Sequence, residues 1–259
     1  MGVRALNLKT IVITGASGGI GAALASHYAG PGRILGLHGR DGARLEDCGA
    51  ACREKGAEVH LFQGDVTDRD AMAGWLRDFD SRYPIDLVVA NAGISAGPGP
   101  LTLEDPAQVR RVFDVNLTGI LNTVEPLRDV MVVRGYGHIA IMSSLAGFRG
   151  FPGAPAYCAS KAAARVYGES LVNTMKKKGV GIHVICPGFI KSAMTERNPF
   201  PMPFLMDAEK AASLIARGIE RGKSRIAFPF PVVLGVRLLS CLPEGIAQFL
   251  VKETPSKPR

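Results

Sequence analysis

The stretch Thr10–Gly21, which reads Thr-Ile-Val-Ile-Thr-Gly-Ala-Ser-Gly-Gly-Ile-Gly, decides the fold. Its first five residues have the apolar, β-branched character of a short buried strand, and the glycine cluster Gly15–Gly21 follows at once. From Gly18 to Ala29 the pattern is helical. A glycine-rich turn between a strand and a helix lets a phosphate approach both the backbone and the helix N-terminus. The stretch therefore predicts a nucleotide-binding strand-turn-helix unit.

The rest of the chain repeats this alternation of strand and helix. Strand patterns occur at 33–38, 58–62, 87–90, 138–142, 181–186 and 225–228, and helical patterns at 42–55, 69–81, 106–133, 154–178 and 207–221. The strand segments are apolar rather than alternating, which indicates burial on both faces and a parallel sheet. We therefore expect residues 1–228 to form a single α/β domain, a Rossmann-type doubly wound sheet of about seven strands with helices on both faces.

Composition narrows the class of protein. The 259 residues are 47% hydrophobic, enough for one large core, and carry a net charge of +8. The basic residues are scattered and not interleaved with aromatic ones, so no nucleic-acid partner is expected. The five cysteines show no zinc spacing and fit free thiols in a reducing compartment, so no metal is expected. The start of the chain has no signal-peptide or myristoylation pattern, and we expect a cytoplasmic protein.

Four short motifs occur in order along the chain. The glycine spacing is Gly15-x-x-x-Gly19-x-Gly21, Gly64-Asp-Val66 follows the third strand, Asn91-Ala-Gly93 the fourth, and Pro187-Gly188 the sixth. Together they resemble the short-chain dehydrogenase/reductase family, over about residues 8–228. The resemblance implies an oxidoreductase that transfers hydride between a nicotinamide cofactor and a small carbonyl or alcohol substrate.

The resemblance also implies a set of cofactor-binding residues. Asp65 would contact adenine, Ile190 would back the nicotinamide ring, and Ser192 would hold the carboxamide where the family often has Thr. The full set is Gly15, Ser17, Gly18, Gly19, Ile20, Gly21, Arg40, Asp65, Val66, Asn91, Ala92, Gly93, Tyr157, Lys161, Pro187, Gly188, Ile190 and Ser192.

The end of the second strand bears on the choice of cofactor. NAD enzymes of the family usually carry Asp at the position of Gly39, whose carboxylate would repel a 2′-phosphate, and here Arg40 follows instead. A guanidinium suits a phosphate. We expect NADP(H) rather than NAD(H). The alternative is that Arg40 is an ordinary residue at the start of a helix, partly neutralised by Asp41.

Tyr157 and Lys161 stand four residues apart, on one face of the predicted helix 154–178. A neighbouring ammonium favours phenolate, so we expect Lys161 to lower the pKa of Tyr157, the proton donor in reduction. By the resemblance, the catalytic set is Asn116, Ser144, Tyr157 and Lys161. Ser144, rather than Ser143, would hold the substrate oxygen, and Asn116 would kink a helix beside the site.

The substrate side is less defined. By the resemblance, about residues 192–206 form a substrate lid, and Met194 and Phe148 are expected to join Ser144 and Tyr157 as substrate contacts. Their apolar character favours a hydrophobic substrate, unless these residues pack only against the core or a second subunit.

The segment 229–251 is apolar, but Pro243 interrupts it, so a membrane-spanning helix is not expected. Three alternatives remain: an extra helix over the cleft, a contact in a homodimer or homotetramer, or a peripheral membrane attachment. The polar, Pro-rich end 252–259 is expected to be loose.

Two further functions compete with an active dehydrogenase. One is a catalytically idle nucleotide-binding or redox-sensing protein on the same fold, which would be free to lose any of the four catalytic residues, yet all four are intact. The other is an epimerase or dehydratase of the extended relatives, disfavoured by the length and the glycine spacing.

Overall fold

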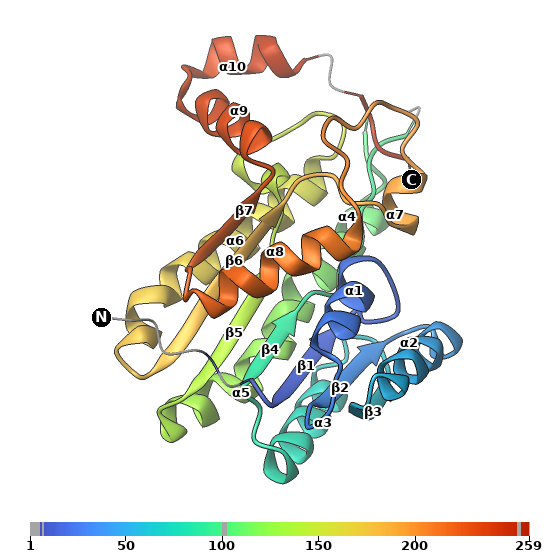
Figure 1. The fold of residues 1–259 in the computed structure, drawn as a ribbon. Coiled ribbons are helices and arrows are strands. Elements are labelled where there is room, and N and C mark those ends of the chain that lie inside the picture. Colours follow the sequence, from blue (N-terminus) through green and yellow to red (C-terminus); the bar gives the residue numbers. More distant parts are fainter. Residues whose placement is uncertain (1–5, 7, 100–102, 253–254, 259) are drawn as a thin grey trace.

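The computed structural model describes residues 6, 8–99, 103–252 and 255–258. Its centre is a parallel seven-stranded sheet in the order β3-β2-β1-β4-β5-β6-β7 (Figure 1). The strands are β1 (Thr10–Thr14), β2 (Ile34–Gly39), β3 (Glu58–Gln63), β4 (Leu87–Ala90), β5 (Gly137–Met142), β6 (Val180–Pro187) and β7 (Arg225–Phe228). All seven strands expected from the sequence are present, and the sheet order reverses direction between β1 and β4, where a doubly wound sheet opens a crevice.

Helices cover both faces of the sheet. The helices α1 (Gly19–Tyr28), α2 (Gly42–Glu54) and α8 (Ala208–Glu220) pack on one face, and α3 (Arg69–Arg82), α5 (Gly119–Arg134) and α6 (Pro155–Lys176) on the other. Leu24 and Ile215 belong to the first core, and Phe79 and Val124 to the second; all four side chains are fully or almost fully buried. This confirms the Rossmann-type fold with helices on both faces.

The single helix expected over 106–133 is wrong. The structure has α4 (Pro106–Phe113), a π-helical turn at Asp114–Thr118, and then α5. The turn carries the buried side chain of Asn116, which exchanges two hydrogen bonds with the backbone of Ile94. A buried amide must be satisfied, and a π turn inserts the extra residue that brings it to its partner.

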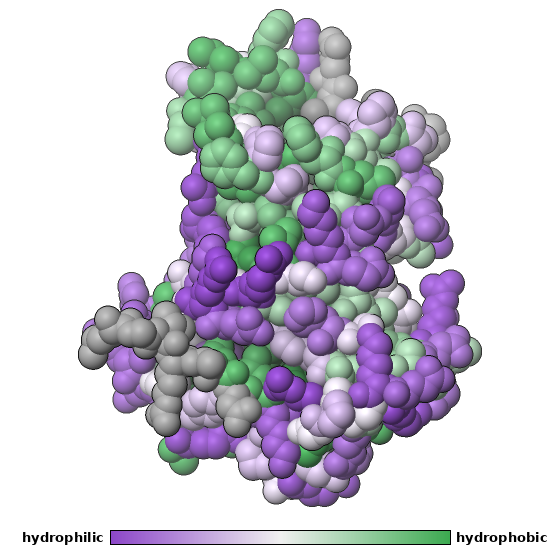
Figure 2. Space-filling model, viewed as in Figure 1, coloured by the Kyte–Doolittle hydropathy of each residue, from purple (hydrophilic) through white to green (hydrophobic). Residues whose placement is uncertain are grey.

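After β7 the chain forms α9 (Phe230–Cys241) and α10 (Glu244–Val251), separated at Pro243 as the sequence predicts. Val233 of α9 packs against Leu145, Val184 and Cys186. Within the described residues, no helix is both long and apolar enough to cross a membrane. Figure 2 shows instead that apolar surface gathers over α9 and α10 at one end of the molecule.

Residues 255–258 correct the expectation of a loose end. Lys257 N donates to Gly153 O at 2.9 Å, and Gly97 N and Gly99 N donate to Pro258 O and Lys257 O, each at 3.0 Å. The described residues 255–258 are therefore held by main-chain hydrogen bonds to the segments around Gly97 and Gly153. Polar composition did not reveal that main-chain pairing fixes this segment.

Candidate active site

A cleft of about 750 Å³ runs along the carboxyl ends of β1, β4, β5 and β6. The glycine loop after β1 lies at one end, and Tyr157 of α6 lines the wall further along. The other end is closed by the segment after β6, by α9, and by Pro255 and Lys257. This is the crevice at the switch point, where doubly wound sheets bind their ligands.

The glycine loop has a backbone shape that only glycine supports. Gly15 and Gly19 have φ angles of +68° and +53°, and a Cβ on Gly21 would lie 2.1 Å from Gly15 O. Asn91 Nδ2 donates to Thr14 O at 2.9 Å and to Gly15 O at 3.2 Å, so the loop is fixed from β4 as well. The result is a preformed backbone cradle at the N-terminus of α1, which fits a pyrophosphate group.

Position 39, at the end of β2, leaves little room for a side chain. A Cβ on Gly39 would lie 3.1 Å from both Cβ and Oγ of Ser17, tighter than ordinary contact. Asp41 accepts from Arg44 N at 3.1 Å and pairs with the Arg44 guanidinium at 3.4 Å. Within the described chain, Asp41 is therefore engaged with Arg44 rather than with Arg40. Arg40 is exposed and lines the cleft, as does Arg44, which sequence reasoning missed.

Two of the expected cofactor residues do not line the cleft. Gly21 lies behind the loop, packed on Gly15 O. The carboxylate of Asp65 accepts from Thr67 N and Oγ1 at 3.0 and 2.8 Å and from Arg111 Nη2 at 2.8 Å. Burial alone would raise the pKa of Asp65, but these bonds hold it at about 2. The carboxylate thus fixes the turn, and its neighbour Val66 lines the cleft.

The other expected cofactor residues all line the cleft: Gly15, Ser17, Gly18, Gly19, Ile20, Arg40, Val66, Asn91, Ala92, Gly93, Tyr157, Lys161, Pro187, Gly188, Ile190 and Ser192.

Ser144 and Tyr157 face each other across the middle of the cleft. The hydroxyl of Ser144 hydrogen-bonds that of Tyr157, and Ser144 Oγ also accepts from Ala146 N at 3.1 Å. Ser143 Oγ donates to Lys161 O at 2.7 Å, so its hydroxyl braces β5 against α6. The structure therefore brings Ser144, and not Ser143, to the tyrosine hydroxyl.

The pKa expected for Tyr157 needs correction. Burial raises the pKa of Tyr157, and only the hydrogen bond from Ser144 opposes this. Lys161 Nζ donates to Met142 O at 3.0 Å and lies 5.9 Å from the centre of the Tyr157 ring, too far to dominate. Burial, helped by the charge of Lys257, lowers the pKa of Lys161 to about 8. The phenol is therefore protonated and able to donate a proton.

Asn116 lies behind the cleft wall and acts on the site through other residues. Its Nδ2 donates to Ile94 O at 2.9 Å and to Ser160 Oγ at 3.0 Å, and Ser160 Oγ donates to Tyr157 O at 2.8 Å. It thus ties the loop after β4 to the turn of α6 that carries Tyr157. Gly93 lies between the side chains of Asn116 and Lys161, since a Cβ on Gly93 would be 3.2 Å from both Asn116 Oδ1 and Lys161 Nζ.

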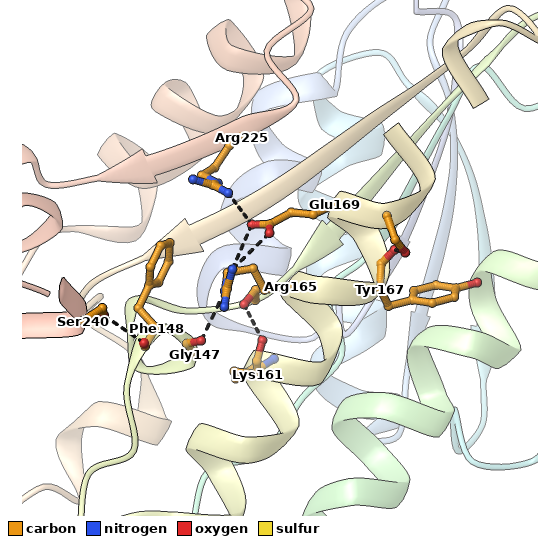
Figure 3. A network of polar contacts seen from close by, with 10 residues as sticks. Gly147, Phe148, Lys161, Arg165, Tyr167, Glu169, Arg225 and Ser240 are labelled. Atoms are coloured by element: carbon orange, nitrogen blue, oxygen red, sulfur yellow. Dashed lines mark hydrogen bonds and ion pairs between the residues drawn. The ribbon is translucent and has the colours of Figure 1, made fainter. Parts of the chain in front are cut away.

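The substrate end contains one of the two additional residues expected there. Met194 lines the cleft, but Phe148 does not. Figure 3 shows Phe148 among polar groups behind the wall: the guanidiniums of Arg165 and Arg225 lie 4.7 and 5.8 Å from its ring centre. Glu169 accepts from both arginines, at 3.0 and 2.7 Å, and so fixes them there. Phe148, at the end of the turn Leu145–Phe148, is thus not among the residues that line the cleft, and its contact with a substrate stays a prediction.

The apolar wall at this end comes from other segments: Phe151, Phe189, Phe200, Pro201, Pro203, Val232 and Val236. The expected lid 192–206 thus contributes directly, and its ends are fixed by backbone bonds from Lys191 N to Met206 O at 2.9 Å and from Met206 N to Phe189 O at 3.0 Å. One side of α9 also covers the cleft, which agrees with the first of the three alternatives for the C-terminal extension. Sequence reasoning missed Lys257 and Pro255 altogether, and nothing in their polar surroundings signalled them.

Taken together, the switch-point crevice, the glycine cradle and the Ser-Tyr-Lys cluster define an oxidoreductase that uses a nicotinamide dinucleotide. The chain belongs to the short-chain dehydrogenase family, whose sequence profile matches residues 9–200.

Similar proteins agree with this class. An uncharacterized oxidoreductase of Myxococcus xanthus is 38% identical over 242 residues, which cover 93% of this chain and 95% of that protein. The solved short-chain dehydrogenase from Sphingobium yanoikuyae in complex with NADPH superposes with a TM-score of 0.80 at 25% identity, covering 95% and 96% of the two chains. A short-chain dehydrogenase/reductase from Burkholderia phymatum in complex with NAD has the same fold, with a TM-score of 0.81 at 23% identity and 99% of each chain covered.

Proposed function

We propose that this enzyme reduces a carbonyl group on a hydrophobic small molecule with NADPH, and oxidises the corresponding alcohol in reverse. The observation that carries the proposal is the paired hydroxyls of Ser144 and Tyr157 in the wall of a cleft that begins with the glycine cradle. In reduction, both hydroxyls donate to the carbonyl oxygen, and Tyr157 gives its proton to the alkoxide as it forms. The nicotinamide supplies the hydride when bound.

The other residues of the set position this pair. Lys161, whose Nζ donates to Met142 O, would hold the nicotinamide ribose when the cofactor is bound, and its positive charge would stabilise the tyrosinate left after proton transfer. Asn116 holds the turn of α6 that carries Tyr157. This arrangement favours an active enzyme over an idle nucleotide-binding protein, because binding a nucleotide does not require a protonated phenol in the cleft wall.

The preference for NADPH rests on the end of β2. Arg40 and Arg44 both line the cleft there, and Ser17 leaves little space for an acidic side chain at position 39. A 2′-phosphate bound there would lie near the guanidiniums of Arg40 and Arg44. Among the described residues that line this part of the cleft, the one carboxylate is that of Asp41, which is already paired with Arg44. The apolar wall formed by Phe151, Phe189 and α9 favours a hydrophobic substrate.

The proposal is tested by following NADPH oxidation while aldehydes, ketones, steroids and fatty 3-keto compounds are offered in turn, with NADH in a parallel series. We expect turnover of at least one hydrophobic carbonyl, and a lower KM for NADPH than for NADH. Tight binding of NADPH without turnover of any carbonyl class would favour the idle nucleotide-binding protein. Equal use of NADH would contradict the cofactor preference alone.

Two exposed apolar surfaces bear on partners. We propose that the enzyme forms homodimers or homotetramers through α5 and α6, where the apolar side chains Val130, Val133 and Val166 are exposed. Light scattering after size exclusion is expected to show an oligomer that Val133→Asp with Val166→Asp converts to monomer. A monomeric wild-type protein would contradict the proposal.

The outer faces of α9 and α10 form the second surface, with Phe230, Leu234, Leu238, Ile246, Phe249 and Leu250 exposed. Two basic residues lie in the same segment, Arg237 within α9 and Lys252 directly after α10, so we propose that this surface attaches an otherwise cytoplasmic enzyme to an anionic membrane surface. Sedimentation with vesicles of phosphatidylcholine, with and without phosphatidylserine, is expected to show binding to the anionic vesicles that Phe249→Ser with Leu250→Ser abolishes. If these substitutions change only the oligomer size, the surface is a subunit contact.

A further inference from the structure

The ammonium of Lys257 lies inside the substrate end of the cleft, next to the reactive tyrosine. Its Nζ donates to Ser95 Oγ at 2.6 Å and lies 3.7 Å from the centre of the Tyr157 ring. Within the described residues, no carboxylate forms an ion pair with it. An ammonium partly removed from water without a counter-charge is unfavourable. Lys257 is half-buried, and among the described residues its partners are a hydroxyl and a ring face, with no anion.

The ionisable groups around Lys257 do not supply the anion. Tyr157, Cys158 and Lys161 face it from α6, and none of them is a carboxylate; Lys161 adds a second positive charge. Glu104, just before α4, approaches the same helix: its Oε2 accepts from Ala156 N at 2.9 Å, and its Oε1 is buried without a hydrogen-bond partner among the described residues. Glu104 forms no ion pair with Lys257 within the described part of the chain. The cleft here is therefore positively charged, with apolar side chains of Phe151, Phe189 and α9 in the surrounding wall.

The position of Lys257 is set by the main chain. Its own N and O bond to Gly153 O and Gly99 N, and the next residue's O accepts from Gly97 N. Both partner segments leave space only because they carry glycine: a Cβ on Gly153 would lie 2.1 Å from Pro255 O, and one on Gly97 would lie 2.8 Å from Lys257 O. These backbone bonds thus fix the position from which the Lys257 side chain extends into the cleft.

We propose that Lys257 binds an anionic group of the substrate, so that the preferred substrates carry a carboxylate close to the reacting carbonyl. This inference rests on the proposed carbonyl reduction at the same site. Lys257 Nζ lies over the ring of the proton-donating Tyr157. One small molecule can therefore place a carboxylate at Lys257 and a carbonyl group at the tyrosine hydroxyl at the same time. One ammonium assisted by one hydroxyl, Ser95, matches a carboxylate; a phosphate dianion would call for more positive donors.

The test compares matched aldehydes that differ only in charge: para-carboxybenzaldehyde, its methyl ester, and benzaldehyde. For the wild type, kcat/KM is expected to be roughly 10- to 100-fold higher for the carboxylate, as for a charged hydrogen bond to a buried group. Lys257→Met should remove this preference, so that within this variant kcat/KM becomes the same for the carboxylate as for benzaldehyde, since Met keeps the apolar stem but not the charge. Lys257→Arg should retain part of it, and Lys223→Met, at an exposed lysine far from the cleft, should retain all of it.

A pH series gives an independent readout. Burial lowers the pKa of Lys257 to about 8, so the preference for the carboxylate should fall as the pH rises through that value. Lys161 titrates in the same range, but it serves the charged and the neutral aldehyde alike. The ratio of the two kcat/KM values therefore reports Lys257 alone.

The outcomes separate the two proposals. If wild type reduces all three aldehydes equally, or if Lys257→Met raises activity on all of them equally, carbonyl reduction stands and Lys257 is not an anion site; in the second case the C-terminal segment obstructs the cleft. If no carbonyl compound is reduced, the proposed function fails. Calorimetric titration of the NADP⁺-loaded protein with benzoate then decides: binding that Lys257→Met abolishes supports the anion site, and equal or absent binding in both proteins overturns it.

Discussion

The two ends of the cleft are built in different ways. At the nucleotide end the wall is main chain: the loop Gly15–Gly21 follows β1 directly, and Asn91 at the end of β4 fixes it. At the substrate end the wall is made of side chains from segments far apart in the sequence: the region around Phe151, the lid, α9, and Lys257 near the C-terminus.

This difference predicts how each end responds to change. A cradle of main-chain groups tolerates no added Cβ where the chain is crowded, as at Gly21, and its ligand is recognised through backbone amides. A wall of side chains can change its chemistry one residue at a time without disturbing the sheet. Ser144, Tyr157 and Lys161 lie in the cleft wall between the two ends, so the proton-transfer step should be most sensitive to substitution there.

The largest effect is expected at that middle point. Tyr157→Phe removes the proton donor but keeps the ring beneath Lys257, so kcat should fall by roughly 10²- to 10⁴-fold while NADPH affinity stays unchanged. Single-turnover kinetics and a fluorescence titration with NADPH measure the two quantities. Tyr167→Phe, on the same helix but outside the cleft, is the matched control and should be fully active. Full activity in Tyr157→Phe would show that the proton comes from another group.

At the nucleotide end, Gly21→Ala should disturb the cradle. Its Cβ would lie 2.1 Å from Gly15 O, so the loop must shift, and we expect a loss of about 1–3 kcal/mol in the free energy of unfolding, as for overpacking elsewhere. NADPH affinity should fall with it, because the amides no longer converge on the pyrophosphate. Denaturant unfolding and calorimetry report the two effects.

The matched control for this substitution lies in the same loop. Gly18 has φ 172° and no heavy atom within 4 Å of its potential Cβ, so Gly18→Ala should leave the free energy of unfolding unchanged. Equal destabilisation by both substitutions would mean that crowding at Gly15 O is not what makes the cradle intolerant.

A smaller effect is expected from a side chain at this otherwise main-chain end. Arg40→Ala should weaken NADPH binding by roughly tenfold and leave NADH binding unchanged, because only NADPH carries the 2′-phosphate. Arg53→Ala is the control: Arg53 is paired with Glu46 on α2 and does not line the cleft, so its loss should change neither affinity. A parallel loss of NADH affinity would assign Arg40 a structural role instead.

The same contrast explains what could be predicted from the sequence. The strands, the cradle and the Ser-Tyr-Lys cluster depend on contiguous patterns, and the structure has the strands and the cradle loop as expected and brings Ser144, Tyr157 and Lys161 to one cleft. Periodicity predicted one helix over 106–133, and the kink at Asn116 was expected only from the family resemblance. The break depends on Asn116 meeting Ile94, 22 residues earlier in the chain. Helical periodicity carries no signal of that contact.

Side-chain direction and burial were equally out of reach. Phe148 is apolar, as expected of a contact with a hydrophobic substrate, but its ring packs against the guanidiniums of Arg165 and Arg225. Spacing alone suggested that Lys161 lowers the pKa of Tyr157, whereas burial of the phenol in the folded chain raises it. Residues 255–258 look like a loose end, because pairing with Gly97, Gly99 and Gly153 leaves no trace in composition.

The smallest expected effect concerns the cation that the substrate end buries. The folded-state pKa of Lys257 is lowered from 10.5 to about 8, so below pH 8 the folded protein bears the full penalty of a desolvated ammonium. Between pH 8 and 10.5 the folded state releases this proton while the unfolded state keeps it, and the penalty is relieved as the pH rises. Lys257→Met should therefore be more stable than wild type at pH 7, by about 1 kcal/mol after allowance for partial exposure, and this advantage should shrink toward pH 10.5.

Denaturant unfolding at several pH values measures the difference in the free energy of unfolding between Lys257→Met and wild type. Because the greater apolarity of Met adds a constant to this difference, its slope with pH is the informative quantity. Lys223→Met, at an exposed lysine, should show no such slope. A parallel pH dependence of wild type and Lys257→Met would mean that the ammonium remains hydrated, and that the substrate end, like the nucleotide end, holds its shape without a buried charge.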